Sequence, residues 1–518
     1  MNNEVTILWV DDEIDLLKPQ ILFLQEKGYS IIEASNGHDA LELCRTKYPD
    51  IVFLDEQMPG RSGLETLADI KAIRPHVPVV MITKSEEEHL MEEAIGSQIS
   101  DYLIKPVKPQ QILLTLKKLL ENRRLVSEKT SSEYQKRFQE FLARINMGLN
   151  AQEWAELYRQ LIFWELELDH ARTDSMREVL ALQKAEANTE FCKFVVRNYK
   201  QWIQRPDDQT PVLSHQVLAR KVLPHLQPGV PAFLIVIDNL RFDQWKVIEP
   251  ELTPNFRVVE EDYFYSILPT STHYSRNALF AGLMPLDIER RFPKLWRNDE
   301  DEGGKNLFEQ EFLTDQLVRC RSNLRMSYTK ITNFQDGRNL VDNMHNLLHN
   351  DLNVIVYNFV DMLSHARTEM DVLKELASDE TAYRSITRSW FQHSPLLEAL
   401  VRIADRKLML FVTTDHGTIR VQEPVKVVGD RETTTNLRYK HGRNLRYNAR
   451  DVLETRNPHE LMLPRPHVSS TFIFAKEDKY FVYPNNYNYH AALYRNTFQH
   501  GGISLEEMIV PVVRLETA

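Results

Sequence analysis

Residues 408–417 read LMLFVTTDHG, a continuous apolar run that ends in an acid, a histidine and a glycine. Two other runs have the same form: residues 232–238 read AFLIVID, and residues 353–361 read NVIVYNFVD. Apolar runs without polar alternation are typical of parallel strands that are covered on both faces. The carboxyl ends of such strands share one edge of the sheet, where ligands bind. These runs therefore predict an α/β domain with acidic side chains gathered at one edge.

The rest of the chain divides by the same kind of pattern. Residues 1–122 alternate strand-like runs with amphipathic helical stretches, which predicts a parallel sheet covered on both faces. Residues 123–227 lose the strands and carry apolar residues at three- and four-residue spacing, which predicts an all-α helical bundle. Strands return in residues 228–518. We therefore expect three domains, with boundaries near 122 and 227.

The composition excludes several classes of protein. The formal net charge is −11, which argues against a protein that binds polyanions over its whole surface. The three cysteines are far apart, so a disulfide framework is not expected and a reducing compartment fits. Acidic residues interrupt the N-terminal stretch, unlike a signal peptide. No uncharged apolar run approaches the ~20 residues of a transmembrane helix, so we expect a cytoplasmic protein without membrane insertion.

Acids and one lysine stand at the strand ends of the N-terminal region. Asp11 and Asp12 follow the first strand, and Asp55 ends the third. Three carboxylates at one sheet edge form an octahedral Mg²⁺ site. A carboxylate beside a metal and a cation, here Lys105, can accept a phosphoryl group. A doubly wound fold with unrelated acids at its edge is the simpler alternative.

These residues resemble the receiver domain of response regulators. Four features of that family occur here in order: the acidic pair, an Asp-x-x-Met-Pro-x-x-x-Gly stretch, a threonine that ends the fourth strand, and Lys-Pro after the fifth. The resemblance implies a (βα)5 receiver in which a sensor histidine kinase phosphorylates Asp55. The other roles that it implies are Mg²⁺ binding by Asp11 and Asp12, phosphoryl contact by Lys105, and relay of the change by Thr83 and Tyr102.

Aspartates and histidines also stand at the strand exits of the C-terminal region: Asp238, Asp361, His365, Asp415, His416 and, near the end, His500. Asp361 and His365 are four residues apart, so both can touch one metal from one face of a helical turn. Mixed His and Asp ligands without cysteine suit Zn²⁺ or Mn²⁺.

Three hydroxyl residues, Thr270, Ser271 and Thr272, stand where a strand gives way to a helix. Free N–H groups and positive potential at a helix N-terminus suit phosphate, and a divalent metal lowers the pKa of a coordinated hydroxyl. The simpler role is that of a helix N-cap. The two roles can be held by different hydroxyls.

The order of these motifs resembles the alkaline phosphatase superfamily and, within it, the PglZ-type domains. The resemblance implies an α/β sandwich with two metal ions and Thr272 as nucleophile, with Ser271 as the alternative. Sulfatase chemistry is disfavoured, because Thr272-His-Tyr-Ser-Arg276 departs from the Cys/Ser-x-Pro-x-Arg motif. The implied ligands are Asp238, Thr272, Asp415 and His416 for one metal, and Asp361, His365 and His500 for the other.

Residues 438–450 read RYKHGRNLRYNAR, which is strongly basic in an otherwise acidic chain. Arginine and lysine can hold phosphate oxygens, and a tyrosine can stack on a base, so a substrate-binding loop is one interpretation. A solvated basic loop is the other. PglZ-type sequences carry a similar Lys-x-Gly-Arg-Asn pattern, which favours the first and implies Lys440, His441, Arg443 and Asn444 as substrate contacts.

The whole chain resembles PorX-type response regulators, which are associated with type IX secretion in Bacteroidota. The resemblance implies a phosphorylation-regulated two-metal phosphodiesterase that acts on nucleotide or oligonucleotide substrates, with monoesterase or mutase activity as the nearer rival. The alternative of another class is a metal-stabilised interaction module that signals through a sigma factor or secretion component, with little or no catalysis. Receiver domains commonly dimerise, so we also expect a phosphorylation-dependent homodimer.

Overall fold

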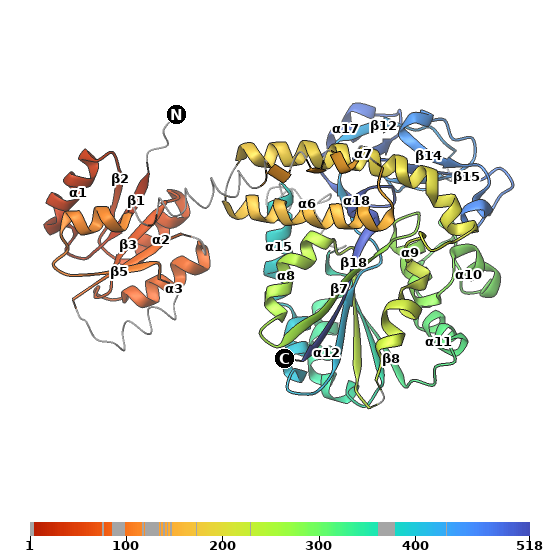
Figure 1. Ribbon diagram of the computed structural model, residues 1–518, viewed down its shortest axis with the longest axis horizontal. Helices are drawn as coiled ribbons and strands as arrows, with labels where there is room; N and C mark the ends of the chain where they lie inside the picture. The colour runs from red at the N-terminus through yellow and green to blue at the C-terminus, as the bar shows by residue number, and fades with distance from the viewer. Residues whose placement is uncertain are drawn as a thin grey trace. The chain divides into compact units, whose positions relative to one another are not determined.

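The computed structural model describes residues 5–74, 77–84, 99–116, 148–171, 174–227, 229–360, 379–430 and 433–517, with scattered positions between 119 and 145. The chain forms two compact units, Met1–Ser132 and Glu133–Ala518, which are described one at a time (Figure 1). The helices of the predicted bundle belong to the second unit, and the three-domain boundaries near 122 and 227 stay a prediction.

The first unit is built on a parallel sheet with strand order β2-β1-β3-β4-β5. Alternate residues of β1, β3 and β4 feed two separate apolar clusters, so the sheet is covered on both faces. This confirms the predicted α/β fold of the N-terminal region. Its elements are β1 Thr6–Val10, a 3-10 turn Ile14–Leu17, α1 Lys18–Glu26, β2 Ser30–Ala34, α2 Gly37–Thr46, β3 Ile51–Asp55, α3 Gly63–Ile73, β4 Val79–Thr83 and β5 Asp101–Ile104.

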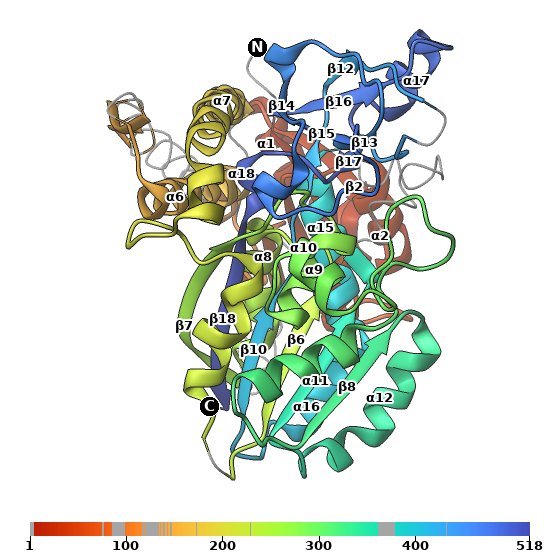
Figure 2. The same ribbon diagram turned by 90° about the vertical axis from the view of Figure 1, so that its right-hand side faces the viewer.

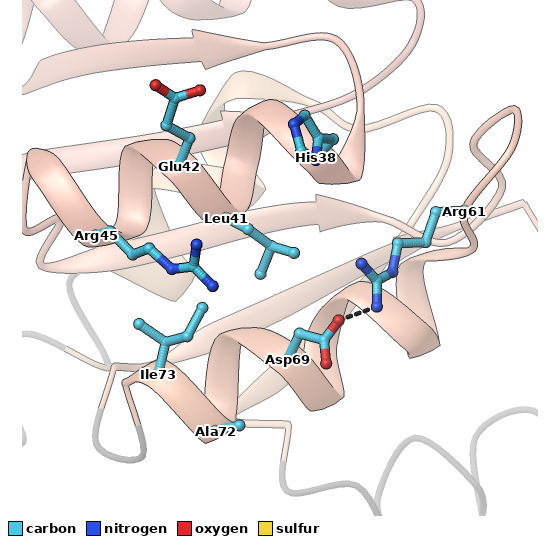
Figure 3. A pocket seen from close by; sticks show the side chains of 8 residues that line it. All are labelled: His38, Leu41, Glu42, Arg45, Arg61, Asp69, Ala72 and Ile73. Carbon is cyan, nitrogen blue, oxygen red and sulfur yellow. Dashed lines mark hydrogen bonds and ion pairs between the residues drawn. The ribbon is translucent and has the colours of Figure 1, made fainter.

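The loop that follows β3 is tied to α3. Ser62 caps this helix by accepting a hydrogen bond from the Glu65 backbone, and the Glu65 side chain accepts one from Ser62 N–H. Arg61 forms an ion pair with Asp69 at one end of a groove between α2 and α3 (Figure 3). Both contacts hold the loop that leaves Asp55 in one conformation.

The second unit contains a six-stranded mixed sheet with order β7-β18-β10-β6-β9-β8. Strands β10, β6, β9 and β8 are parallel, and β18 runs antiparallel to both its neighbours. The apolar runs at 233–237, 354–359 and 408–413 correspond to β6, β9 and β10. The strands are β6 Ala232–Ile237, β7 Phe256–Tyr265, β8 Met326–Ile331, β9 Leu352–Tyr357, β10 Met409–Thr413 and β18 Ile509–Thr517.

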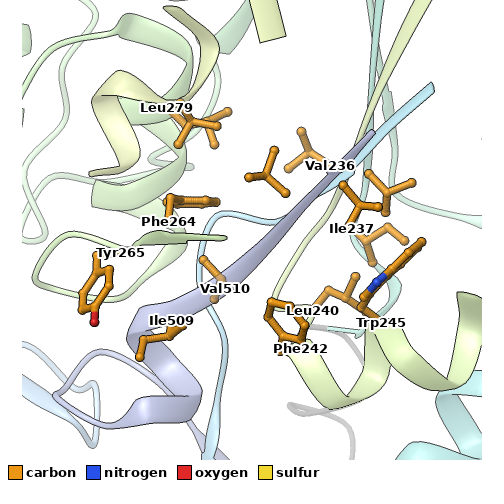
Figure 4. Packing of buried hydrophobic residues seen from close by; sticks show 14 of the residues in the cluster. Val236, Ile237, Leu240, Phe242, Trp245, Phe264, Tyr265, Leu279, Ile509 and Val510 are labelled. Carbon is orange, nitrogen blue, oxygen red and sulfur yellow. The ribbon is translucent and has the colours of Figure 1, made fainter. Parts of the chain in front are cut away.

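Helices and buried apolar side chains pack around this sheet. Figure 4 shows residues of β6, β7, α8, α9 and β18 in one cluster, with Leu240 and Trp245 just beyond the end of β6. The chain that follows Asp238 is therefore anchored in the core. The helices are α8 Phe242–Leu252, α9 Thr272–Ala281, α10 Pro285–Arg291, α11 Glu309–Arg319, α12 Phe334–Leu347, α15 Glu380–Gln392 and α16 Pro395–Ile403.

The two long helices of the predicted bundle, α6 (Ala151–Ala171) and α7 (Asp174–Gln204), lie side by side (Figure 1). They share one core with the sheet: the ring of Phe191 in α7 lies 6.1 Å from that of Tyr265 in β7. The Tyr265 hydroxyl also donates to the backbone carbonyl of Ala151 at 2.7 Å. The helices are thus part of the same packed body as the C-terminal sheet.

Short strands gather at the end of the sheet where β6 and β10 end (Figure 2). The basic segment, expected as a loop, begins as a buried strand, β13, paired antiparallel with β15. Among the described residues, no helix is both long and apolar enough to cross a membrane. The elements of this region are β11 Ile419–Arg420, β12 Glu423–Lys426, β13 Tyr439–Gly442, β14 Val452–Thr455, β15 Thr471–Ala475, β16 Lys479–Val482, α17 Tyr487–Tyr494, β17 Phe498–Gln499 and α18 Leu505–Met508.

Candidate functional site

The first unit brings the predicted acids and lysine together at the carboxyl edge of its sheet. Lys105 Nζ lies 2.8 Å from Asp11 Oδ2 and 3.0 Å from Asp55 Oδ2. Carboxylate oxygens of Asp11, Asp12 and Asp55 lie within 4.8 Å of one another. Burial raises the pKa of Asp55, Asp11 and Asp12 add to the rise, and Lys105 opposes it. This excess of negative charge fits the predicted Mg²⁺ site.

The two predicted relay residues have different surroundings. The Thr83 hydroxyl is nearly buried and donates to Glu56 Oε2 at 2.5 Å. Tyr102, in β5, is 42% exposed. Glu56 follows Asp55 directly, and the sequence pattern assigned it no role. The relay function of Thr83 and Tyr102 stays a prediction.

In the second unit, Asp238, Asp415 and His416 meet because β6 and β10 are neighbours that end side by side. The distance from His416 Nε2 is 3.7 Å to Asp415 Oδ2 and 4.0 Å to Asp238 Oδ1. Thr272, the first residue of α9, places its Oγ1 3.0 Å from His416 Nε2 and 3.3 Å from Asp238 Oδ1. All four residues are buried or nearly so.

The hydrogen bonds of Asp415 and His416 engage one polar side-chain atom of each residue, and the other polar atom faces the cluster formed by these four residues. Asp415 Oδ1 accepts from the backbone N–H of Asn239 and of His416, whereas the buried Oδ2 has no hydrogen-bond partner. His416 Nδ1 faces the carbonyl of Gly417 at 3.0 Å. A carbonyl can only accept, so the neutral ring carries its proton on Nδ1 and presents the Nε2 lone pair to the site.

Arg276, four residues after Thr272, holds the other side of Asp238. Its Nη1 donates to Asp238 Oδ2 at 2.7 Å, and its Nε donates to Glu309 Oε1 at 2.6 Å. Both carboxylates are fully buried, and burial raises the pKa of Asp238, against the opposing pull of Arg276. The sequence motif contained Arg276 but gave no sign that it would pair with an acid 38 positions earlier.

His500 packs against the ring of His416. The two rings are stacked with centroids 4.3 Å apart, and His500 Nδ1 lies 3.2 Å from the carbonyl of Thr270. The Thr270 hydroxyl accepts from Gly501 N–H and donates to the Gly502 carbonyl. Thr270 therefore holds the segment that carries His500. Asp361 and His365, the other predicted ligands of the second metal, lie outside the described residues.

The three hydroxyls at the start of α9 have separate environments. Thr270 bonds the 501–502 backbone, and Thr272 faces the group of ligands. Ser271 occupies the N-cap position, but its side chain makes no capping hydrogen bond. The geometry therefore favours Thr272 over Ser271 as the residue that reaches a bound phosphorus atom.

The four predicted substrate contacts do not share one surface. Lys440 and His441 alternate on β13: Lys440 Nζ donates to the Thr434 carbonyl, while the His441 ring stacks on Phe472 at 4.3 Å. Burial lowers the pKa of Lys440 to about 7. Arg443 is half-buried, and Asn444 is exposed and bonded to Asp430. Their binding role stays a prediction.

Family models match three successive parts of the chain. They are the response regulator receiver domain over residues 7–117, the PorX response regulator linker domain over residues 124–203, and the BREX system PglZ alkaline phosphatase-like domain over residues 217–515. The architecture predicted from the sequence, a receiver, a linker and a PglZ domain, is confirmed by these matches. The last match covers more than half of the chain.

Two curated relatives each match about a quarter of the chain. The transcriptional regulatory protein ZraR of Klebsiella oxytoca is 38% identical over 122 residues, which are 24% of this chain and 28% of that protein. ResD of Bacillus subtilis is 33% identical over 118 residues, 23% of this chain and 49% of that protein. The chain thus matches between about a quarter and a half of the length of these relatives.

Solved receiver structures also match about a quarter of the chain. A CheY-like receiver domain protein from Methanospirillum hungatei is 23% identical, covering 23% of this chain and 96% of its own, with a TM-score of 0.23. A receiver domain protein from Clostridium thermocellum is 28% identical, covering 23% of this chain and 98% of its own, with a TM-score of 0.23.

Proposed function

Because this chain belongs to the family of PglZ alkaline phosphatase-like proteins, we propose that it is a response regulator whose output is a two-metal phosphodiesterase for nucleotide or oligonucleotide substrates. The observation that carries the proposal is the meeting of Asp238, Thr272, Asp415 and His416 at one sheet edge. Such an arrangement places a hydroxyl nucleophile among ligands that suit zinc.

The donor atoms present fit one divalent ion. At metal–ligand distances of 2.0–2.1 Å, the donors of a tetrahedral zinc site stand about 3.4 Å apart. Here Thr272 Oγ1 is 3.3 Å from Asp238 Oδ1 and 3.0 Å from His416 Nε2, which is 3.7 Å from Asp415 Oδ2. The unpartnered Asp415 Oδ2 and the Nε2 lone pair of His416 are also suited to binding a cation. A bound Zn²⁺ or Mn²⁺ would lower the pKa of the Thr272 hydroxyl and neutralise phosphoryl oxygens.

Each residue of the site has a separate role in the proposed reaction. Thr272 Oγ1 attacks phosphorus in line, so that a Thr272–phosphate ester forms and the bond to the leaving alcohol oxygen breaks; water then hydrolyses that ester. Arg276 opposes the rise that burial causes in the pKa of Asp238, and its hydrogen bond fixes the orientation of that carboxylate. We assign the second ion to Asp361, His365 and His500, and the contact of His500 with His416 supports neighbouring positions for the two ions.

The reaction class is tested with bis(p-nitrophenyl) phosphate. We expect the full-length protein, stripped by a chelator, to hydrolyse this diester only after Zn²⁺ or Mn²⁺ is restored, and to hydrolyse p-nitrophenyl phosphate more slowly. Faster turnover of the monoester would assign monoesterase activity instead. Absence of turnover of either ester with every divalent ion would favour the interaction-module alternative.

The receiver supplies the regulation. The receiver match implies a histidine kinase as the phosphate source, and we assign Asp55 as the acceptor. The linker match supports a PorX-type role in control of type IX secretion from the cytoplasm, through partners such as a sigma factor or a secretion component. These regulatory assignments are additional to the esterase reaction, and each can be tested without it.

Phosphorylation is expected to shift the protein from monomer toward dimer. Charge added at Asp55 alters the edge near β4 and β5 through Lys105 and Thr83. Light scattering with beryllofluoride and Mg²⁺ should report a doubled mass for the wild type and an unchanged mass for Asp55→Ala. A monomeric mass for the activated wild type would rule out phosphorylation-driven dimerisation and favour an intramolecular switch.

A further inference from the structure

The turn at 503–507, which leads into α18 (Leu505–Met508), touches both segments that carry the predicted histidine ligands of the metal centre. On one side, Gly417 N–H donates to the Glu507 carbonyl at 3.1 Å. On the other, Gly502 N–H donates to Glu507 Oε1 at 2.8 Å. Gly417 follows His416, and Gly502 lies two residues after His500. The backbone and the side chain of Glu507 therefore hold the two segments that carry these histidines.

The contact at Gly417 leaves no room for adjustment. A Cβ atom at this position would lie 2.0 Å from the Glu506 carbonyl oxygen, so the two backbone segments are in direct contact. His416 also bonds the Gly417 carbonyl through Nδ1. A displacement of residues 506–507 would move Gly417 and, with it, the His416 ring.

The opposite side of the turn is held by the linker helix α7. Asn188 accepts from Leu505 N–H at 2.7 Å and donates to Glu506 Oε2 at 2.9 Å. One turn further along α7, the Cys192 thiol lies 3.2 Å from the Ile503 carbonyl. Asn188 is only 5% exposed, so its two hydrogen bonds form where water does not compete.

Charged contacts add to the same attachment. Lys184, one turn before Asn188, lies 3.6 Å from Glu506 Oε1 and 2.6 Å from Glu165 of α6. Arg384 of α15 joins Glu165, in α6, to Asp243, which lies five residues after the ligand Asp238. The linker helices are thus bonded directly to the turn at 503–507 and, through Arg384, to Asp243 near the start of α8.

We propose that α7 is a positioning element of the metal centre and that Asn188 is its positioning residue, acting through the turn at 503–507 on His416 and His500. The inference rests on the proposed metal-dependent function, because it concerns the placement of those ligands. Asn188 touches neither metal nor substrate. Groups that hydrogen-bond directly to metal ligands change metal affinity by about 10- to 100-fold when they are lost. Asn188 acts one contact further out, so we expect an effect at the lower end of this range.

The experiment measures the affinity of the full-length protein for Zn²⁺ by competition with a chromogenic chelator. We expect Asn188→Ala to weaken zinc binding about tenfold or more, with the circular dichroism spectrum retained. Asn198→Ala is the matched control, because Asn198 lies on the same helix and donates only to the Phe194 carbonyl of its own helix. This control should bind zinc as the wild type does.

A reversal of the hydrogen bond separates positioning from general packing. Asn188→Asp alone brings two carboxylates together and should also weaken zinc binding. Asn188→Asp combined with Glu506→Gln restores a donor and an acceptor in swapped places, and it should regain an affinity within about threefold of the wild type. This pair also decides the matter if Asn188→Ala does not fold.

The outcomes distinguish this inference from the proposed function. Wild-type protein that binds no zinc would contradict both the proposed function and the positioning role of Asn188. A wild type that binds zinc, with Asn188→Ala equally tight or Asn198→Ala equally weakened, would overturn the positioning role of Asn188 alone. Failure of the double variant to regain affinity would also contradict it.

Discussion

Thr272→Ala should lower kcat for bis(p-nitrophenyl) phosphate by at least about a thousandfold, because removal of a covalent nucleophile leaves only binding and electrostatic stabilisation. The fold should survive, since Thr272 is the first residue of α9 and, among the described residues, its side chain forms hydrogen bonds only with Asp238 and His416. The protein should still take up at least one metal ion. Steady-state kinetics and elemental analysis measure the two effects.

Thr272→Ser provides the matched variant, because it keeps a hydroxyl in the same place and should retain a substantial part of the activity. Ser271→Ala should have a much smaller effect than Thr272→Ala. If Thr272→Ala remained fully active while Ser271→Ala did not, the nucleophile would be Ser271. If both remained active, the mechanism would involve no covalent intermediate at this junction.

Asp415→Asn should lower zinc affinity by more than about a hundredfold and abolish hydrolysis. Loss of a residue that only hydrogen-bonds to a metal ligand weakens metal binding by about 10- to 100-fold. Asp415→Asn should have a larger effect, because it removes the charge of a predicted ligand itself. The new amide would keep its oxygen on the Asn239 and His416 N–H groups, so its NH₂ would point to the place of Oδ2. Elemental analysis after dialysis should give about one metal ion fewer per chain.

Asp342→Asn is the control for this change, because Asp342 lies exposed on α12. It should match the wild type in metal content and turnover. Unchanged zinc content in Asp415→Asn would remove this residue from the ligand set and leave Asp238 and His416 to be tested in the same way.

Local sequence patterns predicted most of the elements that position the site. The apolar runs before Asp238 and Asp415 are buried on both faces, and burial of this kind is visible in composition alone. Because parallel strands end at one edge, both acids were expected at that edge. Adjacency of β6 and β10 was not predictable, since strand order depends on how the intervening helices cross the sheet.

Other features depend on contacts between distant segments. Strand β18 is apolar but antiparallel, and nothing in its residues sets that direction. Arg438, in the basic segment, is fully buried in an ion pair with Glu507, although its neighbours in sequence suggested a loop open to solvent. The apolar spacing in the sequence predicted the helices α6 and α7. It did not show that their apolar faces would pack against the C-terminal sheet, because spacing alone does not identify the packing partner of a helix.

The Thr83 hydroxyl donates its single hydrogen to Glu56, so any other acceptor must compete with Glu56 for it. A threonine hydroxyl has one hydrogen to donate, so Thr83 cannot serve Glu56 and a phosphoryl group on Asp55 at the same time. Turning toward the phosphoryl group also leaves the carboxylate of Glu56 in need of another donor. If Asp55 is phosphorylated as we propose, the gain from a contact between Thr83 and the phosphoryl group must therefore exceed the loss of the bond to Glu56.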